Sequence, residues 1–271
     1  MKNILENPTV KEIIDIINNM YRLGWDERNG GNVSYRLNEE EIKDYLDLDD
    51  VKRTFSLNLD ASALKGQYFI ATATGKYFRN TMRNPDVCLG IFRVSEDGKN
   101  AEVLWGYSDG GRATSEIYAH LLCHIERLKT NPNHRVVIHT HPTNVVALSH
   151  VLPNDERIWT RTLWKIMSES IVVFPEGVAV LPWILCGTLE IGKATAAKMS
   201  DRRLVVWGLH GIYGAGDTID EAFGLIETVE KAAEVYLKYA SLPTVNDISD
   251  EGLKELADFF SVTPRKGYLD C

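Results

Sequence analysis

The strongest constraint on this chain is an apolar run, residues 136–138. His139 follows it directly, and a second histidine, His141, stands two residues further on. β-Branched residues in such a run favour a buried strand. In extended chain, residues i and i+2 point to the same face and lie about 7 Å apart at Cα, since each residue rises about 3.3 Å. Two imidazoles placed in this way can bind one metal ion, as two of the three protein ligands of a catalytic zinc site. Taken alone, the pair is equally consistent with two unrelated histidines at a strand end.

The composition is that of an ordinary globular protein, with 271 residues, 44% of them apolar and 25% charged. The net charge of −8 gives nucleic-acid binding no electrostatic support. We find no secretory signal at the start and no apolar run near the ~18 residues of a membrane-spanning helix. We therefore expect a cytoplasmic protein that acts on neither nucleic acid nor a membrane.

The cysteines show neither a C-x-x-C pair nor the spacing of a disulfide framework. There are four of them: Cys88, Cys123, Cys186 and Cys271. This favours a reducing compartment and argues against a cysteine-rich zinc module. A metal site would therefore depend on histidine and carboxylate side chains.

Hydrophobic periodicity predicts helices alternating with strands. We expect helices over residues 10–23, 114–129, 143–151, 159–167, 190–201, 218–239 and 249–260, the last with Ser249 as its N-cap. We expect strands over 33–37, 68–72, 91–94, 103–105, 136–138, 171–174, 179–181 and 204–207, and a helix or an insertion over the acidic stretch 38–50. A hairpin signal at 96–99 argues against a doubly wound parallel sheet. The pattern predicts one α/β domain over residues 1–271, with a central mixed or largely antiparallel sheet flanked by helices.

A third histidine, His210, also follows an apolar strand and stands between Gly208 and Gly211. Glycines allow the backbone to turn sharply beside a bound species. Two histidines on one strand and a third on another match the three-ligand arrangement of a catalytic zinc with an open position. The alternative is a hydrogen-bonded turn histidine, and the strand-borne pair favours the ligand.

Glu116, His120 and His124 stand at i, i+4 and i+8 and therefore share one face of an expected helix. This spacing is compatible with a second metal site. The two histidines lie one step from the apolar positions Leu121 and Ile125, however, which favours residues at the edge of the core. Glu116 differs because it stands at the helix start beside a loop, where a carboxylate can act as a ligand or a base.

Three polar segments carry small hydroxyl or amide side chains: the loops 29–32 and 74–76, and the helix start at Thr114 and Ser115. Backbone N–H groups at turns and helix N-termini bind anions well. Each segment alone would usually be no more than a turn, but together they predict a phosphate cradle. Neither loop matches a P-loop or a dinucleotide-binding glycine pattern, so no nucleotide is implied.

Residues 24–32, 74–80, 114–116, 139–141 and 209–211 together resemble the ordered motifs of the class II (zinc-dependent) aldolase family, which also includes the adducin head domain. The likeness runs from the first expected helix to about Pro264. The resemblance implies one zinc ion per subunit, bound by His139, His141 and His210. It also implies Glu116 as the catalytic acid/base and as a fourth ligand in the empty site.

The resemblance further implies that the phosphate of a substrate is held by Asn29, Asn32, Thr74, Gly75 and Ser115. Thr74 stands where we expect serine, and since the hydroxyl donor is retained, the assignment is kept. A homotetramer with active sites at subunit interfaces is also implied. Glu169, which directly precedes the expected strand 171–174, would be a second catalytic residue there, acting in its own or a neighbouring subunit.

The implied activity is a reversible retro-aldol cleavage. The expected substrate is L-rhamnulose 1-phosphate, cut between C3 and C4 to L-lactaldehyde and the enediolate of dihydroxyacetone phosphate. Zinc would act as the Lewis acid, and Glu116 would protonate the enediolate carbon. The alternatives are an L-fuculose 1-phosphate aldolase, a 4-epimerase, an adducin-like scaffold and a metal-dependent hydrolase. A scaffold has no reason to keep three histidines and Glu116, and the sequence shows no second metal cluster for a hydrolase.

Overall fold

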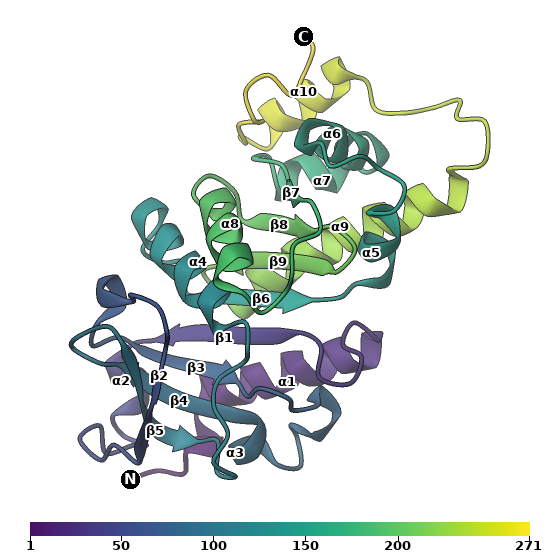
Figure 1. The fold of residues 1–271 in the computed structure, drawn as a ribbon. Coiled ribbons are helices and arrows are strands. Elements are labelled where there is room, and N and C mark those ends of the chain that lie inside the picture. Colours follow the sequence, from purple (N-terminus) through teal and green to yellow (C-terminus); the bar gives the residue numbers. More distant parts are fainter.

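A nine-stranded sheet runs through the molecule in the computed structural model, which describes residues 1–271 (Figure 1). Its strands are β1 (Asn32–Leu37), β2 (Arg53–Ser56), β3 (Tyr68–Thr72), β4 (Leu89–Val94), β5 (Asn100–Gly106), β6 (Val136–Thr140), β7 (Ala179–Leu181), β8 (Leu204–Trp207) and β9 (Gly211–Gly216). Their order is β2-β5-β4-β3-β1-β6-β9-β8-β7. Only β7 and β8 are parallel, and every other pair is antiparallel. The predicted mixed, largely antiparallel sheet is therefore confirmed.

Ten helices surround the sheet: α1 (Pro8–Leu23), α2 (Glu39–Ile42), α3 (Pro85–Cys88), α4 (Ile117–Thr130), α5 (Thr143–Leu148), α6 (Glu156–Ile166), α7 (Ser168–Val173), α8 (Leu189–Met199), α9 (Ile219–Tyr239) and α10 (Asp250–Phe259). Short 3₁₀ turns lie at Ile4–Glu6, Ser62–Leu64 and Phe78–Asn80. Helix α1 ends at Gly24, whose φ of 73° suits glycine. The predicted N-cap of α10 is confirmed, because the Ser249 hydroxyl accepts from Gly252 N–H at 3.2 Å.

Helices cover both faces of the sheet, α4 and α8 on one side and α1 and α9 on the other (Figure 1). In β6, Val136 and Ile138 belong to the core that holds α1 and α9. Val137 packs instead with Ala119 and Cys123 of α4. Every residue of β6 is buried, and burial on both faces explains why its sequence is uninterruptedly apolar up to His139.

The predicted strand at 171–174 is wrong, since Ser168–Val173 forms α7. A four-residue apolar run does not distinguish a strand from a buried helical turn. Here Ile171 is buried while Val172 and Val173 are only partly covered. The segment packs against α6, α9 and α10, with no strand beside it to pair with.

Two strands, β2 and β9, were not predicted from the sequence, and in the acidic stretch 38–50 only α2 is helical. Half of β9 is glycine, which normally argues against a strand. Gly214 and Gly216 allow close packing of α9: a Cβ on Gly214 would lie 2.7 Å from the Ala222 carbonyl oxygen and 2.9 Å from Ile226 Cγ1. Glycine is therefore needed at these positions because α9 packs directly on the strand.

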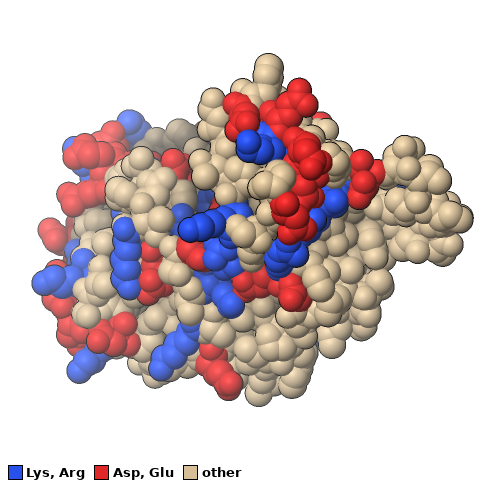
Figure 2. Space-filling model, turned by 90° about the horizontal axis from the view of Figure 1, so that it is seen from above, with Lys and Arg blue, Asp and Glu red and all other residues tan.

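Basic and acidic side chains are intermingled on the face drawn in Figure 2, and neither sign dominates it. Ion pairs tie α10 and the C-terminal segment to the rest of the chain. Arg161 lies 2.7 Å from Asp250, and Arg265 lies 2.7 Å from Asp201. None of the helices combines the length and apolar sequence needed to cross a membrane.

Candidate metal centre and active site

The three predicted metal ligands come together at one end of the sheet. His139 lies in β6, His141 just beyond it, and His210 in the turn between β8 and β9. Their ring centroids are 4.8–5.0 Å apart. One nitrogen from each lies within 4.8 Å of the other two. Residues about seventy positions apart thus form a compact trio of imidazoles.

The hydrogen bonds of two of these imidazoles suit a metal ion. His139 Nδ1 donates to the Ile212 carbonyl oxygen at 3.1 Å, and His141 Nδ1 lies 3.0 Å from the Glu27 carboxylate. Because both partners are acceptors, each Nδ1 carries the hydrogen and each Nε2 keeps a lone pair. The two Nε2 atoms face each other at 3.2 Å. Two lone pairs at that distance repel each other, and a cation between them relieves the repulsion, so the donor set fits a divalent metal.

Burial keeps His139 and His210 neutral. It lowers the pKa of His139 well below its ordinary value and the pKa of His210 to about 4, and neighbouring imidazoles lower both further. Neutral imidazole is the form that binds a metal. These two ligands are therefore in their metal-binding form near pH 7.

Glu116 is the carboxylate of the site. It directly precedes α4, is 8% exposed, and its Oε2 lies 3.6 Å from His139 Nε2. The same oxygen accepts from Asn32 Nδ2 at 2.8 Å and from the Tyr213 hydroxyl at 3.1 Å. Burial raises the pKa of Glu116, although these two donors oppose the rise. A buried carboxyl of this kind can carry a proton beside the three imidazoles.

Strand register explains how these groups meet. Asn32 of β1 and Tyr213 of β9 are both cross-strand neighbours of His139. The three side chains form a row across the sheet on the face that α4 covers, and the Tyr213 ring stacks on His139 at 4.4 Å. Sequence reasoning missed Tyr213 because it missed β9, the strand that carries it.

Two further side chains at the site were also missed. Glu27 orients His141, and a ligand atom of Cys186 lies within 4.8 Å of those of Glu116 and His210. A single cysteine or glutamate leaves no spacing signal in a sequence. An exposed thiol therefore stands beside the site, and the expectation that a metal draws on histidine and carboxylate alone stays a prediction.

Of the three polar segments predicted as a phosphate cradle, the first lies against His141 and the third leads directly to Glu116. Thr74 N–H donates to the Arg112 carbonyl at 2.9 Å, which joins the second loop to the residues just before Thr114. A Cβ on Gly30 would lie 2.8 Å from His141 Cε1, so the first loop lies directly against the trio. Gly75 has a φ of 70° and faces open space. Asn29 and Ser115 are exposed, whereas Asn32 is buried against Glu116.

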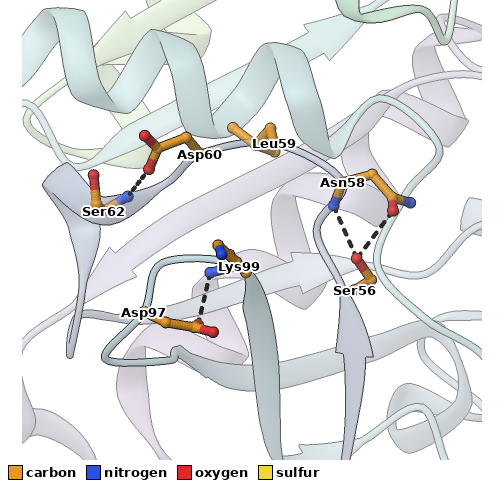
Figure 3. A pocket seen from close by; sticks show the side chains of 7 residues that line it. All are labelled: Ser56, Asn58, Leu59, Asp60, Ser62, Asp97 and Lys99. Atoms are coloured by element: carbon orange, nitrogen blue, oxygen red, sulfur yellow. Dashed lines mark hydrogen bonds between the residues drawn. The ribbon is translucent and has the colours of Figure 1, made fainter.

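Glu169, the remaining predicted site residue, lies in the first turn of α7 and is exposed. It belongs to neither group of clustered ligand atoms. The protein also has a separate pocket of about 520 Å³, and none of the predicted site residues lines it (Figure 3). Its polar side chains bond to nearby backbone, as when Asp60 accepts from Ser62 N–H at 3.0 Å and Asp97 from Lys99 N–H at 2.9 Å.

Asp26, beside the site loop, is buried with neither carboxylate oxygen hydrogen-bonded, and burial raises its pKa to about 7. Between pH 4 and 7 the folded protein therefore holds a proton that the unfolded chain releases, so stability falls as pH rises through that window. We expect Asp26→Asn to be more stable than the parent by about 1–2 kcal/mol at pH 8, with no gain near pH 4. Urea unfolding at both pH values measures this. An unchanged pH dependence would show that Asp26 does not cause the loss.

Comparison with known proteins agrees with this geometry. The family profile described as Class II Aldolase and Adducin N-terminal domain matches residues 11–237. The chain belongs to the class II aldolase family. This class II aldolase is 50% identical to a rhamnulose-1-phosphate aldolase of Listeria innocua over 99% of both chains. It is 44% identical to one of Mannheimia succiniciproducens, over 99% of this chain and 100% of the other.

A solved structure also resembles this class II aldolase. A sugar-phosphate aldolase from Thermotoga maritima superimposes with a TM-score of 0.75 at 30% sequence identity. The match covers 88% of the class II aldolase described here and 97% of the other chain. The family resemblance inferred from the motifs is thus confirmed over nearly the whole chain.

Proposed function

We propose that this class II aldolase reversibly cleaves L-rhamnulose 1-phosphate to dihydroxyacetone phosphate and L-lactaldehyde, with one Zn²⁺ held by His139, His141 and His210. The observation that carries the proposal is the convergence of three imidazoles with a buried carboxylate, whose oxygen lies 3.6 Å from Nε2 of His139. The names and the near-complete coverage of the relatives support the sugar. We place the reaction in the cytoplasm, since a charged sugar phosphate does not diffuse through a bilayer.

The bound metal would supply a Lewis acid for the negative charge that develops on the substrate oxygens. The chain itself must move a proton. When the C3–C4 bond breaks, the C4 hydroxyl loses its proton and C4 becomes the aldehyde carbon. The electron pair of the broken bond forms a double bond between C2 and C3 and leaves negative charge on the C2 oxygen, and C3 must then be protonated to give the ketone. We assign this proton to Glu116, whose raised pKa favours the acid form. In the synthetic direction, the carboxylate takes the same proton back from carbon.

The substrate phosphate would be bound by Asn29, Asn32, Thr74, Gly75 and Ser115. Asn32 Nδ2 has two hydrogens and gives one to Glu116, so the second remains for a phosphate oxygen. Binding a phosphate away from the breaking bond positions the reacting carbons. The same residue would in this way link substrate binding to the orientation of the carboxyl group.

Replacing Thr74 by Val should test this cradle. Losing one hydrogen bond to a charged group costs about 1.5–3 kcal/mol. We expect KM for L-rhamnulose 1-phosphate to rise about 10- to 100-fold, with kcat little changed, while Thr74→Ser stays within twofold of the parent. Steady-state kinetics with phosphorylated and unphosphorylated L-rhamnulose would separate binding of the phosphate from binding of the rest of the sugar. Equal loss on both sugars would contradict a role for Thr74 at the phosphate.

The sugar is tested by aldehyde release from L-rhamnulose 1-phosphate and L-fuculose 1-phosphate, assayed side by side. We expect the first to be cleaved with the higher kcat/KM. Faster cleavage of L-fuculose 1-phosphate would favour the alternative aldolase. Conversion of a pentulose phosphate without free aldehyde would favour a 4-epimerase.

We further propose a homotetramer in which Glu169 acts at the site of a neighbouring copy, taking the proton that the C4 hydroxyl loses. Glu169→Gln should then lower kcat by about 10²-fold. Glu251→Gln is the matched control, because Glu251 is likewise exposed at the second position of a helix, α10. Light scattering gives the oligomeric state. A fully active monomer, or normal turnover by Glu169→Gln, would contradict this assignment.

A further inference from the structure

Two rows of buried polar side chains face each other beneath the site. Strand β1 presents Asn32 and Ser34, which are two residues apart, and α4 with its N-cap presents Glu116, His120 and His124. All five are at most 8% exposed, and Ser34 and both histidines are completely buried. The expectation that His120 and His124 lie at the edge of the core understated their burial. Neither histidine takes part in the reaction steps proposed above.

These side chains form one continuous chain of hydrogen bonds. Ser34 Oγ lies 2.8 Å from His124 Nε2 and 2.7 Å from His120 Nδ1. His120 Nε2 contacts Asn32 Oδ1, and Asn32 Nδ2 lies 2.8 Å from Glu116 Oε2. The chain thus runs from the interior of the α4 layer to the carboxyl group at the metal centre.

His124, at the inner end of this series of hydrogen bonds, determines which group donates in each of them. His124 Nδ1 is buried and has no partner. An unpaired N–H there would cost more than an unpaired lone pair, so the hydrogen lies on Nε2 and is donated to Ser34. The Ser34 hydroxyl must then donate to His120 Nδ1, and His120 Nε2–H to Asn32 Oδ1. The Asn32 amide is left with its N–H group aimed at Glu116.

We propose that His120 is a positioning residue for the aldolase reaction: together with Ser34 and His124, it fixes the Asn32 amide so that its N–H group holds the Glu116 carboxyl in place. This rests on the function proposed above. Without the His120 donor, the amide could turn over and present its oxygen to a carboxylate oxygen, which would repel Glu116 from its working position. The effect should be largest in turnover, with a smaller effect on KM through the second Asn32 N–H group and none on metal binding.

The test uses purified, zinc-loaded enzyme and L-rhamnulose 1-phosphate. We expect His120→Phe to lower kcat at least tenfold while metal content stays that of the parent. The rise in KM should be smaller than the fall in kcat, since Asn32 is only one of the residues proposed to bind the phosphate. His120→Gln, whose amide can donate to Asn32, should recover a large part of the loss. The matched control is Thr160→Val, which removes a different buried hydrogen bond, to Val178 N–H at 3.0 Å, and should keep the parental kcat.

A double-mutant cycle shows whether His120 acts through Asn32. In an Asn32→Ala background, His120→Phe should produce no further loss of kcat, since the group that it orients is already gone. Losses that multiply, or a normal kcat for His120→Phe, would overturn the proposal. If His120→Phe does not fold, Ser34→Ala takes its place, and an unchanged kcat would be equally decisive. Inactivity of the parent enzyme would instead overturn the proposed function.

Discussion

Glu116→Gln is expected to lower kcat for aldol cleavage by about 10²- to 10⁴-fold. The amide keeps the size of the side chain and can still bond Asn32 or Tyr213, which donate to Glu116 Oε2 at 2.8 and 3.1 Å. It cannot deliver a proton to carbon. The protein should therefore fold, bind its metal and bind substrate with little change in KM. A coupled assay of dihydroxyacetone phosphate measures kcat and KM, and metal analysis of the same sample measures the bound metal.

The matched control for this variant is Glu126→Gln. Glu126 lies on α4, the helix that Glu116 directly precedes, and its carboxylate bonds only the exposed Lys129 ammonium, at 2.7 Å. That variant should keep the parental kcat. Near-normal turnover by Glu116→Gln would place the acid on another residue. Loss of metal along with activity would instead mean that Glu116 serves mainly as a ligand.

His210→Ala is expected to have the second large effect, because it removes one of only three imidazoles. Two remaining ligands should not retain zinc, and loss of a Lewis acid worth ~4 kcal/mol of transition-state stabilisation lowers the rate about 10³-fold. Zinc content and cleavage rate should fall together. The exposed His150, outside the trio, provides the control: His150→Ala should keep both.

Chelation of the unmodified enzyme complements this variant. Removal of the metal should abolish cleavage, and added Zn²⁺ should restore it, whereas His210→Ala should not be rescued by Zn²⁺ at the same concentration. Activity that survives chelation would refute the metal-dependent mechanism. Better rescue by Co²⁺ or Fe²⁺ would keep the mechanism and change the assigned ion, since imidazole suits all three.

Local periodicity predicted most of the fold. Apolar spacing located α1, α4 and α9, and β-branched runs located β3, β6 and β8. It failed where tertiary packing overrides local preference. The run at 171–174 has the composition of a strand but packs as α7, and β9 is rich in glycine because α9 lies directly against it.

The candidate site divides in the same way. The amino-acid sequence alone placed His139 and His141 side by side, because the side chains of a strand alternate and the spacing of two is local. The tertiary structure decided that His210 joins them, that Nδ1 of His139 and of His141 is occupied so that Nε2 remains for a metal, and that Asn32 and Tyr213 hold Glu116. These contacts depend on the register of β1, β6 and β9. Register is set by the packing of whole strands and helices, which no local spacing records.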